Sequence, residues 1–532
     1  RLWMLPSQMK DFSQSLVAVS LFSSNFLFVQ ESGYFAAAAE KMPLLHTWSL
    51  AVEEQYYVLF PIFFILAWPF GKSRVFCMIV IIAAFSLALS EWGWRNSATA
   101  NFYLAPTRAW ELLAGSIAAF IVRRRGLQSN GGLALLGLGG IIFSIFAYDE
   151  STPFPSFFAL IPIVGVVLIL LYSGNETITS KLLSAKFFVG IGLISYSAYL
   201  WHQPLFAFAR IYLLEKPSSS LMLSLSILSF LFAVLSWRFL EKPFRGKDAL
   251  IGSRIKIFSF SFLGLLSFVF IGLVGHSNNG FENRFEKVLK DGVDHFGYYQ
   301  YLNSRYLDCE PRRVAEKALH WEGFLRCKQT KQGEADWIIL GDSHAEHLFL
   351  GFADSFPSKN IAFYILGEKP YLSEKVFENI YEVLLAPQKP KMIILTMHYV
   401  YYPGTKNSLL SGFGDAIRAL QKAGHKVVLI GDIPRYEIDP QECIYAKSLT
   451  EAKNYCSMDK IEAVKQEKVY DGILRTLSKT LSADYYPISD YFCDAKKCSM
   501  VLGNTILYRD NNHLNIRGSM LIGKYLANLL GR

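Results

Sequence analysis

The chain has 532 residues, of which 52% are hydrophobic and 18% charged. This charged fraction is below the ~25% of ordinary soluble domains and excludes a uniformly soluble protein. The net charge of +9 fits basic loops beside membrane segments better than nucleic-acid binding, because residues 280–532 carry no basic stripe with interleaved aromatic residues. Residues 1–275 are dominated by apolar runs, whereas residues 280–532 have the mixed charge of a soluble domain.

The first half is predicted to cross a membrane repeatedly. A helix needs ~20 apolar residues to span the hydrocarbon core, and eight runs approach that length. Phe12–Val29 carries Ser, Gln and Asn, so it is a candidate for a span, a re-entrant segment or an interfacial helix. The eight runs are Tyr56–Phe70, Val75–Leu89, Ala109–Val122, Leu133–Tyr148, Phe157–Tyr172, Phe187–Leu213, Leu221–Phe239 and Ile257–Val274.

Positive charge predicts how these segments are oriented. Lysine and arginine gather in alternate loops, and the positive-inside rule places such loops in the cytoplasm. The last span then leaves the cytoplasm, so we expect the second half to lie in the periplasm or its equivalent. The chain begins with Arg and shows no signal-peptide pattern, so we expect it to lack the N-terminus of a longer protein. The basic residues are Lys72, Arg74, Arg123, Arg124, Arg125, Lys181, Lys186, Lys242, Arg245, Lys247, Arg254 and Lys256.

Polar side chains near the spans are the candidates for chemistry in this half. Such groups are costly in a membrane and by default indicate function. The alternative for each is an interface anchor, a structural ion pair or part of an aromatic belt. The candidates are His46, Glu53, Glu54, Arg108, Glu111, Tyr196 and His202.

Four separated motifs resemble the acyltransferase-3 family, whose members include bacterial O-antigen and peptidoglycan O-acetyltransferases. The motifs are His46–Pro61 (HTWSLAVEEQYYVLFP), Pro106–Gly115 (PTRAWELLAG), Ile194–Pro204 (ISYSAYLWHQP) and Glu241–Arg245 (EKPFR). The resemblance covers residues 1–245 and implies a polytopic α-helical membrane domain with acetyl-CoA as acyl donor and no permanently bound cofactor. It also implies an additional transmembrane helix, here 246–275. The family's N-terminal portion, with an Arg and a His on the first span, has no counterpart in this chain.

The second half reads as a connector, 276–334, followed by an α/β domain, 335–532. Short apolar runs alternate there with helical patterns, which predicts a parallel, flavodoxin-like sheet. The expected strands are Trp337–Leu340, Ile361–Leu366, Met392–Met397 and Lys426–Gly431. The expected helices are Ser411–Ala423, Ile461–Leu481 and Ile516–Leu530, with a further helix starting at Ala345.

Ser343 lies in Gly341-Asp342-Ser343-His344, directly after the first of these strands. At a strand-to-helix turn we expect the hydroxyl of a nucleophilic serine to be exposed, with helix N–H groups near a developing oxyanion. The alternative is that Asp342 or Ser343 only caps the helix. A serine nucleophile also needs a base and an orienting carboxylate. Asp510 and His513 are three residues apart, so that one short turn can bring them together, although this run is also ordinary turn chemistry.

Together these two stretches resemble the SGNH (GDSL-like) hydrolase family. The resemblance implies that Ser343 is the nucleophile and that Asp510 and His513 complete the triad. It implies an oxyanion hole formed by Ser343 and a glycine, for which Gly367 is the candidate. The family's Gly-x-Asn-Asp block is missing, because Ile393–His398 contains no asparagine.

Six of the seven cysteines lie in the second half, as expected for three disulfides in an oxidising compartment. The pairs that close short loops are Cys309–Cys327, Cys443–Cys456 and Cys493–Cys498. We expect no metal site, since no Cys-x-x-Cys pair occurs and the histidines are not clustered with the cysteines.

The sequence therefore favours a bacterial inner-membrane, multi-pass O-acyltransferase with a periplasmic C-terminal domain. It would move an acetyl group from a cytoplasmic donor to hydroxyls of a surface polysaccharide such as lipopolysaccharide O-antigen, through an acyl-serine. Its partners would be the acyl-CoA donor, a surface glycan and the lipid bilayer, with no nucleic acid. One alternative is a membrane-tethered carbohydrate esterase, in which water resolves the acyl-serine. Another is a non-enzymatic assembly or sensing protein with a degenerate SGNH domain.

Overall fold

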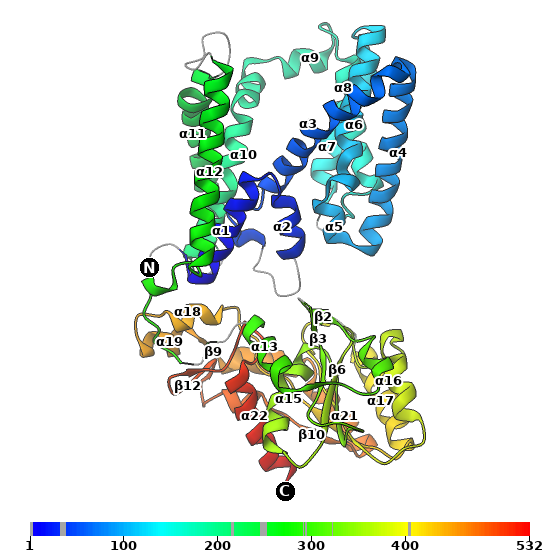
Figure 1. Cartoon of the computed structure of the whole chain (residues 1–532), viewed down its shortest axis with the longest axis vertical. Coiled ribbons are helices and arrows are strands. Elements are labelled where there is room, and N and C mark those ends of the chain that lie inside the picture. Colours follow the sequence, from blue (N-terminus) through cyan, green and yellow to red (C-terminus); the bar gives the residue numbers. More distant parts are fainter. Residues whose placement is uncertain are drawn as a thin grey trace. The chain divides into compact units, whose positions relative to one another are not determined.

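The computed structural model describes residues 4–31, 39–149, 151–213, 217–244, 253–290, 292, 295–321, 323–402 and 406–531. They form two compact units, Arg1–Glu282 and Asn283–Arg532 (Figure 1). Two of the basic residues used to predict the orientation, Arg245 and Lys247, lie outside the described residues.

The regular structure described in the first unit is helical (Figure 1). Four helical segments are long and apolar enough to cross a membrane: Thr47–Phe70, Lys72–Asn96, Ser219–Phe244 and Arg254–Ser277. Gly131–Ala147 and Phe157–Tyr172 are apolar but shorter. The main helices of this unit are α1 (Pro6–Ser20), α2 (Ser24–Glu31), α3 (Thr47–Ala67), α4 (Lys72–Asn96), α6 (Ala105–Arg125), α7 (Gly131–Ala147), α8 (Leu160–Tyr172), α10 (Lys186–Tyr212), α11 (Ser219–Ser236) and α12 (Arg254–Ser277).

All eight predicted spans are helical, but they do not all have the apolar length of a span. Helix α6 includes Arg108, Glu111 and three arginines at its end, which lowers its apolar character. The candidate Phe12–Val29 is not one helix, because α1 ends at Ser20 and α2 begins at Ser24. Phe22 has a positive φ of 53° in the turn between them. Helix α1 packs along α12 instead of continuing.

The second unit is built on a seven-stranded sheet of order β1-β4-β6-β5-β7-β8-β10. Strands β6, β5, β7, β8 and β10 are parallel, and this 2-1-3-4-5 order is that of flavodoxin-like folds. Strand β4 runs antiparallel to β6, and β1 antiparallel to β4. The strands are β1 (Leu307–Asp308), β4 (Cys327–Gln329), β5 (Trp337–Gly341), β6 (Ile361–Ile365), β7 (Met392–Leu395), β8 (Lys426–Ile430) and β10 (Asp484–Tyr486).

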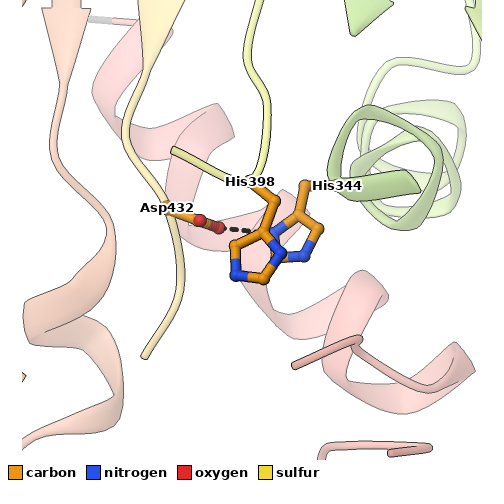
Figure 2. Close-up of side chains that lie close together, drawn as sticks. All are labelled: His344, His398 and Asp432. Atoms are coloured by element: carbon orange, nitrogen blue, oxygen red, sulfur yellow. Dashed lines mark hydrogen bonds and ion pairs between the residues drawn. The ribbon is translucent and has the colours of Figure 1, made fainter. Parts of the chain in front are cut away.

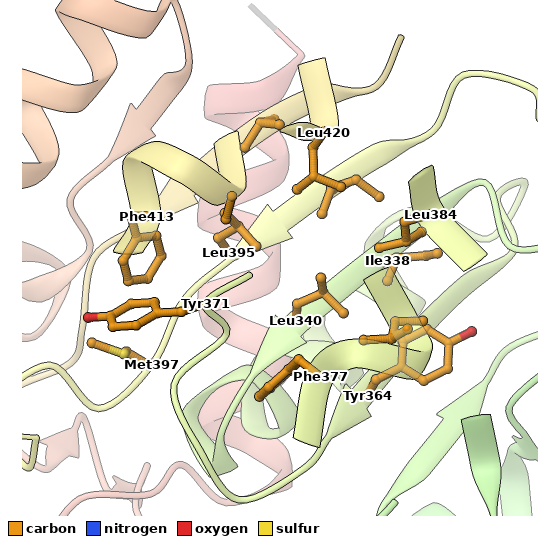
Figure 3. Packing of buried hydrophobic residues seen from close by; sticks show 14 of the residues in the cluster. Ile338, Leu340, Tyr364, Tyr371, Phe377, Leu384, Leu395, Met397, Phe413 and Leu420 are labelled. Atoms are coloured by element: carbon orange, nitrogen blue, oxygen red, sulfur yellow. The ribbon is translucent and has the colours of Figure 1, made fainter. Parts of the chain in front are cut away.

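Helices cover the sheet because its strands are apolar on both faces, as in other buried parallel sheets. Ile338 and Leu340 of β5 and Leu395 of β7 belong to a large core with Phe413, Leu420 and Leu384 (Figure 3). These last three come from the helices α17 (Lys406–Lys422) and α16 (Glu378–Leu385). The predicted helix Ile461–Leu481 is interrupted, forming α20 (Lys460–Lys468) and α21 (Asp471–Leu481). The reason is Tyr470, which is buried between them and stacks on Tyr399 with ring centroids 4.6 Å apart.

Two helices of this unit cross in very close contact. They are α15 (Ser343–Ser355), which begins two residues before the predicted start, and α22 (Ile516–Leu530), which has the predicted bounds. Gly351 of α15 faces Gly523 of α22, and a Cβ on either would collide with the partner's backbone. The start of α15 is thereby fixed beside the segment that leads into α22.

The three expected disulfides, Cys309–Cys327, Cys443–Cys456 and Cys493–Cys498, are all formed. The first joins residues from the stretch expected to be a connector. Part of that stretch belongs to the sheet as β1 and β4: β4 pairs with β6, β1 pairs with β4, and together they extend the sheet at one edge. Cys77 is the free cysteine recorded among the described residues.

Candidate active site

Ser343 is the first residue of α15, at the carboxyl end of β5. Asp342 caps the helix, accepting a hydrogen bond from the His344 N–H at 2.8 Å and another from the His398 N–H at 2.9 Å. The capping role is therefore filled by Asp342, and the Ser343 hydroxyl makes no hydrogen bond among the described residues. Ser343 is only 4% exposed, unlike the exposed serine that we expected, because His398 and His513 from two other segments pack against the start of α15.

Asp510 and His513 form a tight turn immediately before α22. Asp510 Oδ2 lies 2.7 Å from His513 Nδ1, and its Oδ1 accepts hydrogen bonds from the Asn512 and His513 N–H groups at 2.7 and 2.6 Å. The Arg509 N–H donates to the His513 carbonyl at 2.9 Å and closes the turn. The aspartate thus fixes both the backbone and the imidazole, as the orienting member of a triad does.

The contact between α15 and α22 brings this turn to the serine. The ring centroids of His513 and His344 are 5.0 Å apart, and His344 directly follows Ser343. Catalytic hydrogen bonds are often long before substrate binds. The arrangement therefore brings an imidazole–carboxylate pair beside the residue that follows Ser343, and these are the three groups that nucleophilic catalysis uses.

A second group of buried side chains, His344, His398 and Asp432, lies close together at this end of the sheet (Figure 2). His344 Nδ1 lies 2.5 Å from Asp432 Oδ1, and the His344 ring stacks on His398 with centroids 4.2 Å apart and planes 11° apart. Sequence reasoning did not assign these residues. Each follows one of the predicted strands β5, β7 and β8. The carboxyl ends of parallel strands lie at one edge of a sheet, and this rule could have predicted that the three residues meet.

His398 occupies the stretch in which the SGNH family places its asparagine. Its Nδ1 lies 3.3 Å from the Asn512 amide nitrogen, which can only donate, so the ring proton sits on Nε2. That Nε2 is buried and has no hydrogen-bond partner among the described residues. An unpaired donor at this edge is suited to receive a developing negative charge. Gly367, the expected oxyanion glycine, has φ 78° and lies two residues beyond Ile365, the register partner of Gly341.

Metal binding is an alternative role for these three side chains. One ligand atom each from His344, His398 and Asp432 lie within 4.8 Å of one another. However, an imidazole binds a metal in its ring plane, and two parallel stacked rings direct their lone pairs along parallel planes instead of toward one point. The His344–Asp432 hydrogen bond also occupies one ligand pair. The arrangement fits hydrogen bonding better than coordination.

A buried ionic cluster joins the helix that carries Ser343 to the segment that carries Asp510 and His513. Glu346 of α15 accepts hydrogen bonds from Arg326 Nε and Nη2 at 3.1 and 2.9 Å and from the Tyr299 hydroxyl at 2.7 Å. Arg509 Nη2 lies 3.6 Å from Glu346, and its guanidinium is 3.7 Å from the Tyr298 ring centroid. Because Arg509 precedes Asp510, the cluster connects the nucleophile helix with the Asp–His turn.

Comparison with known families identifies both units. Residues 7–238 match a family described as an acyltransferase domain. Residues 309–528 match a family described as an SGNH domain fused to AT3 domains. The chain is an acyltransferase membrane domain joined to an SGNH domain.

Relatives of this acyltransferase–SGNH chain include peptidoglycan O-acetyltransferase OatA of Listeria monocytogenes, which is 28% identical over 45% of this chain and 41% of its own length. O-acetyltransferase OatA of Staphylococcus aureus is 28% identical over 46% of this chain and 43% of its own length. The chain thus spans about two fifths of these relatives in the matched region. Among solved structures, the lipopolysaccharide acetyltransferase periplasmic domain of Salmonella ser. Paratyphi A aligns with 38% of this chain and 85% of its own. That alignment has 18% identity and a TM-score of 0.29.

In the acyltransferase domain, some candidates come together at the start of α3. His46 precedes the first residue of that helix, makes no side-chain capping hydrogen bond, and lies against His202 with ring centroids 5.4 Å apart. Tyr199, which was not among the candidates, packs on His46 at 5.1 Å and bonds to the Ser49 hydroxyl at 2.6 Å. Tyr199 is three residues before His202, so both lie on one face of the helix. This spacing could have identified Tyr199 as a candidate.

Of the other candidates, one pair also reaches the start of α3 and three lie elsewhere. Arg108 lies 3.4 Å from Glu111 and is 4.7 Å from the ring centroid of Trp48, so this pair reaches the start of α3 from α6. Tyr196 is 46% exposed on α10. Glu53 and Glu54 are partly buried on α3, about two turns beyond His46.

Burial keeps the imidazoles of the SGNH site uncharged. It lowers the pKa of His344 to about 4 and that of His398 to about 3, from an ordinary 6.5. It also lowers the pKa of His347 and His513 well below that value, although Asp510 opposes the shift at His513. A neutral His513 can act as a base at mildly acidic pH.

We expect the SGNH domain to lose stability on acidification from about pH 7 to about pH 5. Below 6.5 the unfolded histidines bind protons that the folded, buried ones do not. Asp432 acts in the opposite direction, because burial raises its pKa to about 7 from 3.8, and Asp342 is raised as well. Four histidines lower the stability on acidification and two aspartates raise it, so the melting temperature should fall. A melting temperature of the full chain that rises between these pH values would contradict this balance.

Proposed function

We propose that this chain acts in O-acetylation of a cell-surface polysaccharide such as lipopolysaccharide O-antigen, with acetyl-CoA as the cytoplasmic acyl donor. The observation that supports it most is the Asp510–His513 pair, joined at 2.7 Å and held by α22 beside the serine that begins α15. A membrane domain of the acyltransferase family precedes this site on the same chain. Sugar acylation outside the membrane needs such a domain, because acyl-CoA is absent there.

The reaction on the SGNH domain has two steps. Ser343 Oγ attacks the acyl carbonyl carbon while His513 takes the serine proton, and His513 then returns this proton to the leaving group, giving an acyl-serine. A glycan hydroxyl next attacks the acyl-serine, His513 takes its proton, and that proton passes to Ser343 Oγ as the ester bond breaks. Asp510 orients the imidazole throughout. The Ser343 N–H, His398 Nε2 and the Gly367 N–H are the proposed donors to the oxyanion.

The membrane domain would deliver the acyl group. His46 and His202, which meet at the start of α3, are its proposed transfer site, with Glu53, Glu54, Arg108, Glu111 and Tyr196 as further candidates. The proposed location is a bacterial inner membrane with the SGNH domain in the periplasm. Three disulfides in the second unit support an oxidising compartment for it.

Mass spectrometry of surface glycans tests this function in cells that carry the full-length protein. We expect an added acyl mass with the native protein and its loss with Ser343→Ala. If the added acyl mass persists in the variant, Ser343 does not take part in the transfer. Lower acylation with the native protein than without it would instead indicate an esterase, in which water takes the place of the glycan.

A further inference from the structure

The SGNH domain contains a cavity of about 230 Å³ that no step described above uses. It lies at the carboxyl ends of the strands, where open α/β sheets bind their ligands. Its lining includes Lys369, Tyr371, Met397, Tyr399, Tyr402 and Lys468. Figure 3 shows Tyr371 and Met397 side by side under Phe413, at one end of the hydrophobic core.

One loop separates this cavity from the nucleophile. Residues 396–402 follow β7 and carry both sets of side chains. Met397 and Tyr399 line the cavity, whereas His398 between them stacks on His344 beside Ser343. Tyr401 in turn stacks on His398, with ring centroids 5.7 Å apart, and is 48% exposed. A molecule in the cavity would therefore lie one loop away from the acyl-serine.

The aromatic lining fits a sugar. Three tyrosines border the cavity, and rings of this kind offer both a flat apolar face and a hydroxyl group. The volume is below the roughly 300–1,000 Å³ of pockets for drug-sized ligands, so it suits a single sugar unit better than a chain of several.

The charge at the cavity indicates an anionic sugar. Lys369 Nζ lies 5.9 and 5.7 Å from the ring centroids of Tyr371 and Tyr402. Neither Lys369 nor Lys468 has an acidic partner among the described residues. The acids nearest to Lys468 in the chain have partners of their own: Glu467 accepts from the Ser489 hydroxyl at 3.1 Å and Asp471 from Arg475 Nε at 2.7 Å. Two unpaired cations at a tyrosine-lined cavity are complementary to a carboxylate or phosphate.

We infer that this cavity is an acceptor subsite for an acidic sugar unit, which carries a carboxylate or a phosphate group. The inference rests on the proposed function, because it assigns the cavity to the glycan that resolves the acyl-serine. Lys369 and Lys468 bind the anionic group, and the tyrosines bind the ring. The subsite makes the enzyme selective for an acidic glycan over a neutral one.

Binding of two matched sugars to the full-length protein in detergent tests the subsite. Methyl β-D-glucuronide and methyl β-D-glucoside differ only in a carboxylate in place of a hydroxymethyl group. We expect the native protein to bind the glucuronide about tenfold more tightly, since hydrogen bonds to charged groups are the strong ones. The double variant Lys369→Gln/Lys468→Gln should lose this preference, with its melting temperature measured to establish folding. Lys369→Arg should retain it.

Lys479→Gln is the matched control, because Lys479 is exposed on α21 and does not line the cavity. Equal binding of the two sugars by the native protein would overturn the inference, as would an unchanged preference in the folded double variant. Ser343→Ala separates the two proposals: it should abolish acylation and keep the preference for the glucuronide. A native protein that shows the preference but never acylates Ser343 would overturn the proposed function and leave the subsite standing.

Discussion

Replacing His513 with alanine is expected to lower the rate of acyl transfer by roughly 10⁴-fold or more. His513 supplies the imidazole of the Asp-x-x-His turn. Its Nδ1 lies 2.7 Å from Asp510 Oδ2. In the proposed mechanism, neither the serine nor the glycan hydroxyl would then have a base. The rate of acetyl transfer to glycan by the full-length protein is the measurement, and His320→Ala, a change at an exposed histidine, is the control.

Asp510→Asn should also cost about 10⁴-fold, because an amide cannot hold the imidazole in the same tautomer. The two losses should not multiply, since residues that act as a unit give grossly non-additive effects. A double variant of His513→Ala and Asp510→Asn should therefore be about as slow as His513→Ala alone. A product of the two separate losses would show that Asp510 and His513 do not act as one couple.

Replacing Glu346 with glutamine is expected to lower the free energy of unfolding of the SGNH domain by about 3–5 kcal/mol. Glu346 is fully buried and its carboxylate is within 3.6 Å of the guanidinium groups of both Arg326 and Arg509. A neutral amide leaves two buried cations uncompensated, and this cost far exceeds that of one lost hydrogen bond. Because Glu346 is on α15 and Arg509 precedes Asp510, the start of α15 and the catalytic turn should loosen together.

Thermal unfolding and hydrogen exchange of peptides from α15 and residues 508–515 measure this loss in the full-length protein. Glu316→Gln is the matched control, because its ion pair with Arg312 at 3.1 Å is exposed on both sides. Such surface pairs contribute only about 0–1 kcal/mol. If Glu346→Gln were no more damaging than Glu316→Gln, the buried cluster would not be what fixes the site.

Local patterns predicted those parts of the fold that depend on neighbours in sequence. Alternating strands and helices indicated the parallel sheet, and β5, β6, β7 and β8 are within two residues of their expected bounds. Short loops indicated the disulfide pairs, and the spacing of Asp510 and His513 indicated their contact. Strands β1 and β4 were not predicted, because segments of two or three residues are too short to show the alternating pattern of a strand.

Features that depend on the order of strands could not be predicted in the same way. His344, His398 and Asp432 are 34 to 88 residues apart in sequence and meet only because β5, β7 and β8 are adjacent. The burial of Ser343 has the same origin, since the surrounding histidines come from distant loops. The break at Tyr470 is likewise a tertiary effect, because Tyr470 is buried against Tyr399, which lies far from it in sequence.

The most direct test of the central claim, transfer through an acyl-serine, is the mass of the peptide that contains Ser343. Full-length protein in membranes would receive isotope-labelled acetyl-CoA, first without glycan and then with it. We predict a labelled acetyl group on Ser343 that accumulates without glycan and disappears when glycan is added. Labelled glycan formed by a protein whose Ser343 never carries the label, or by Ser343→Ala, would contradict the account.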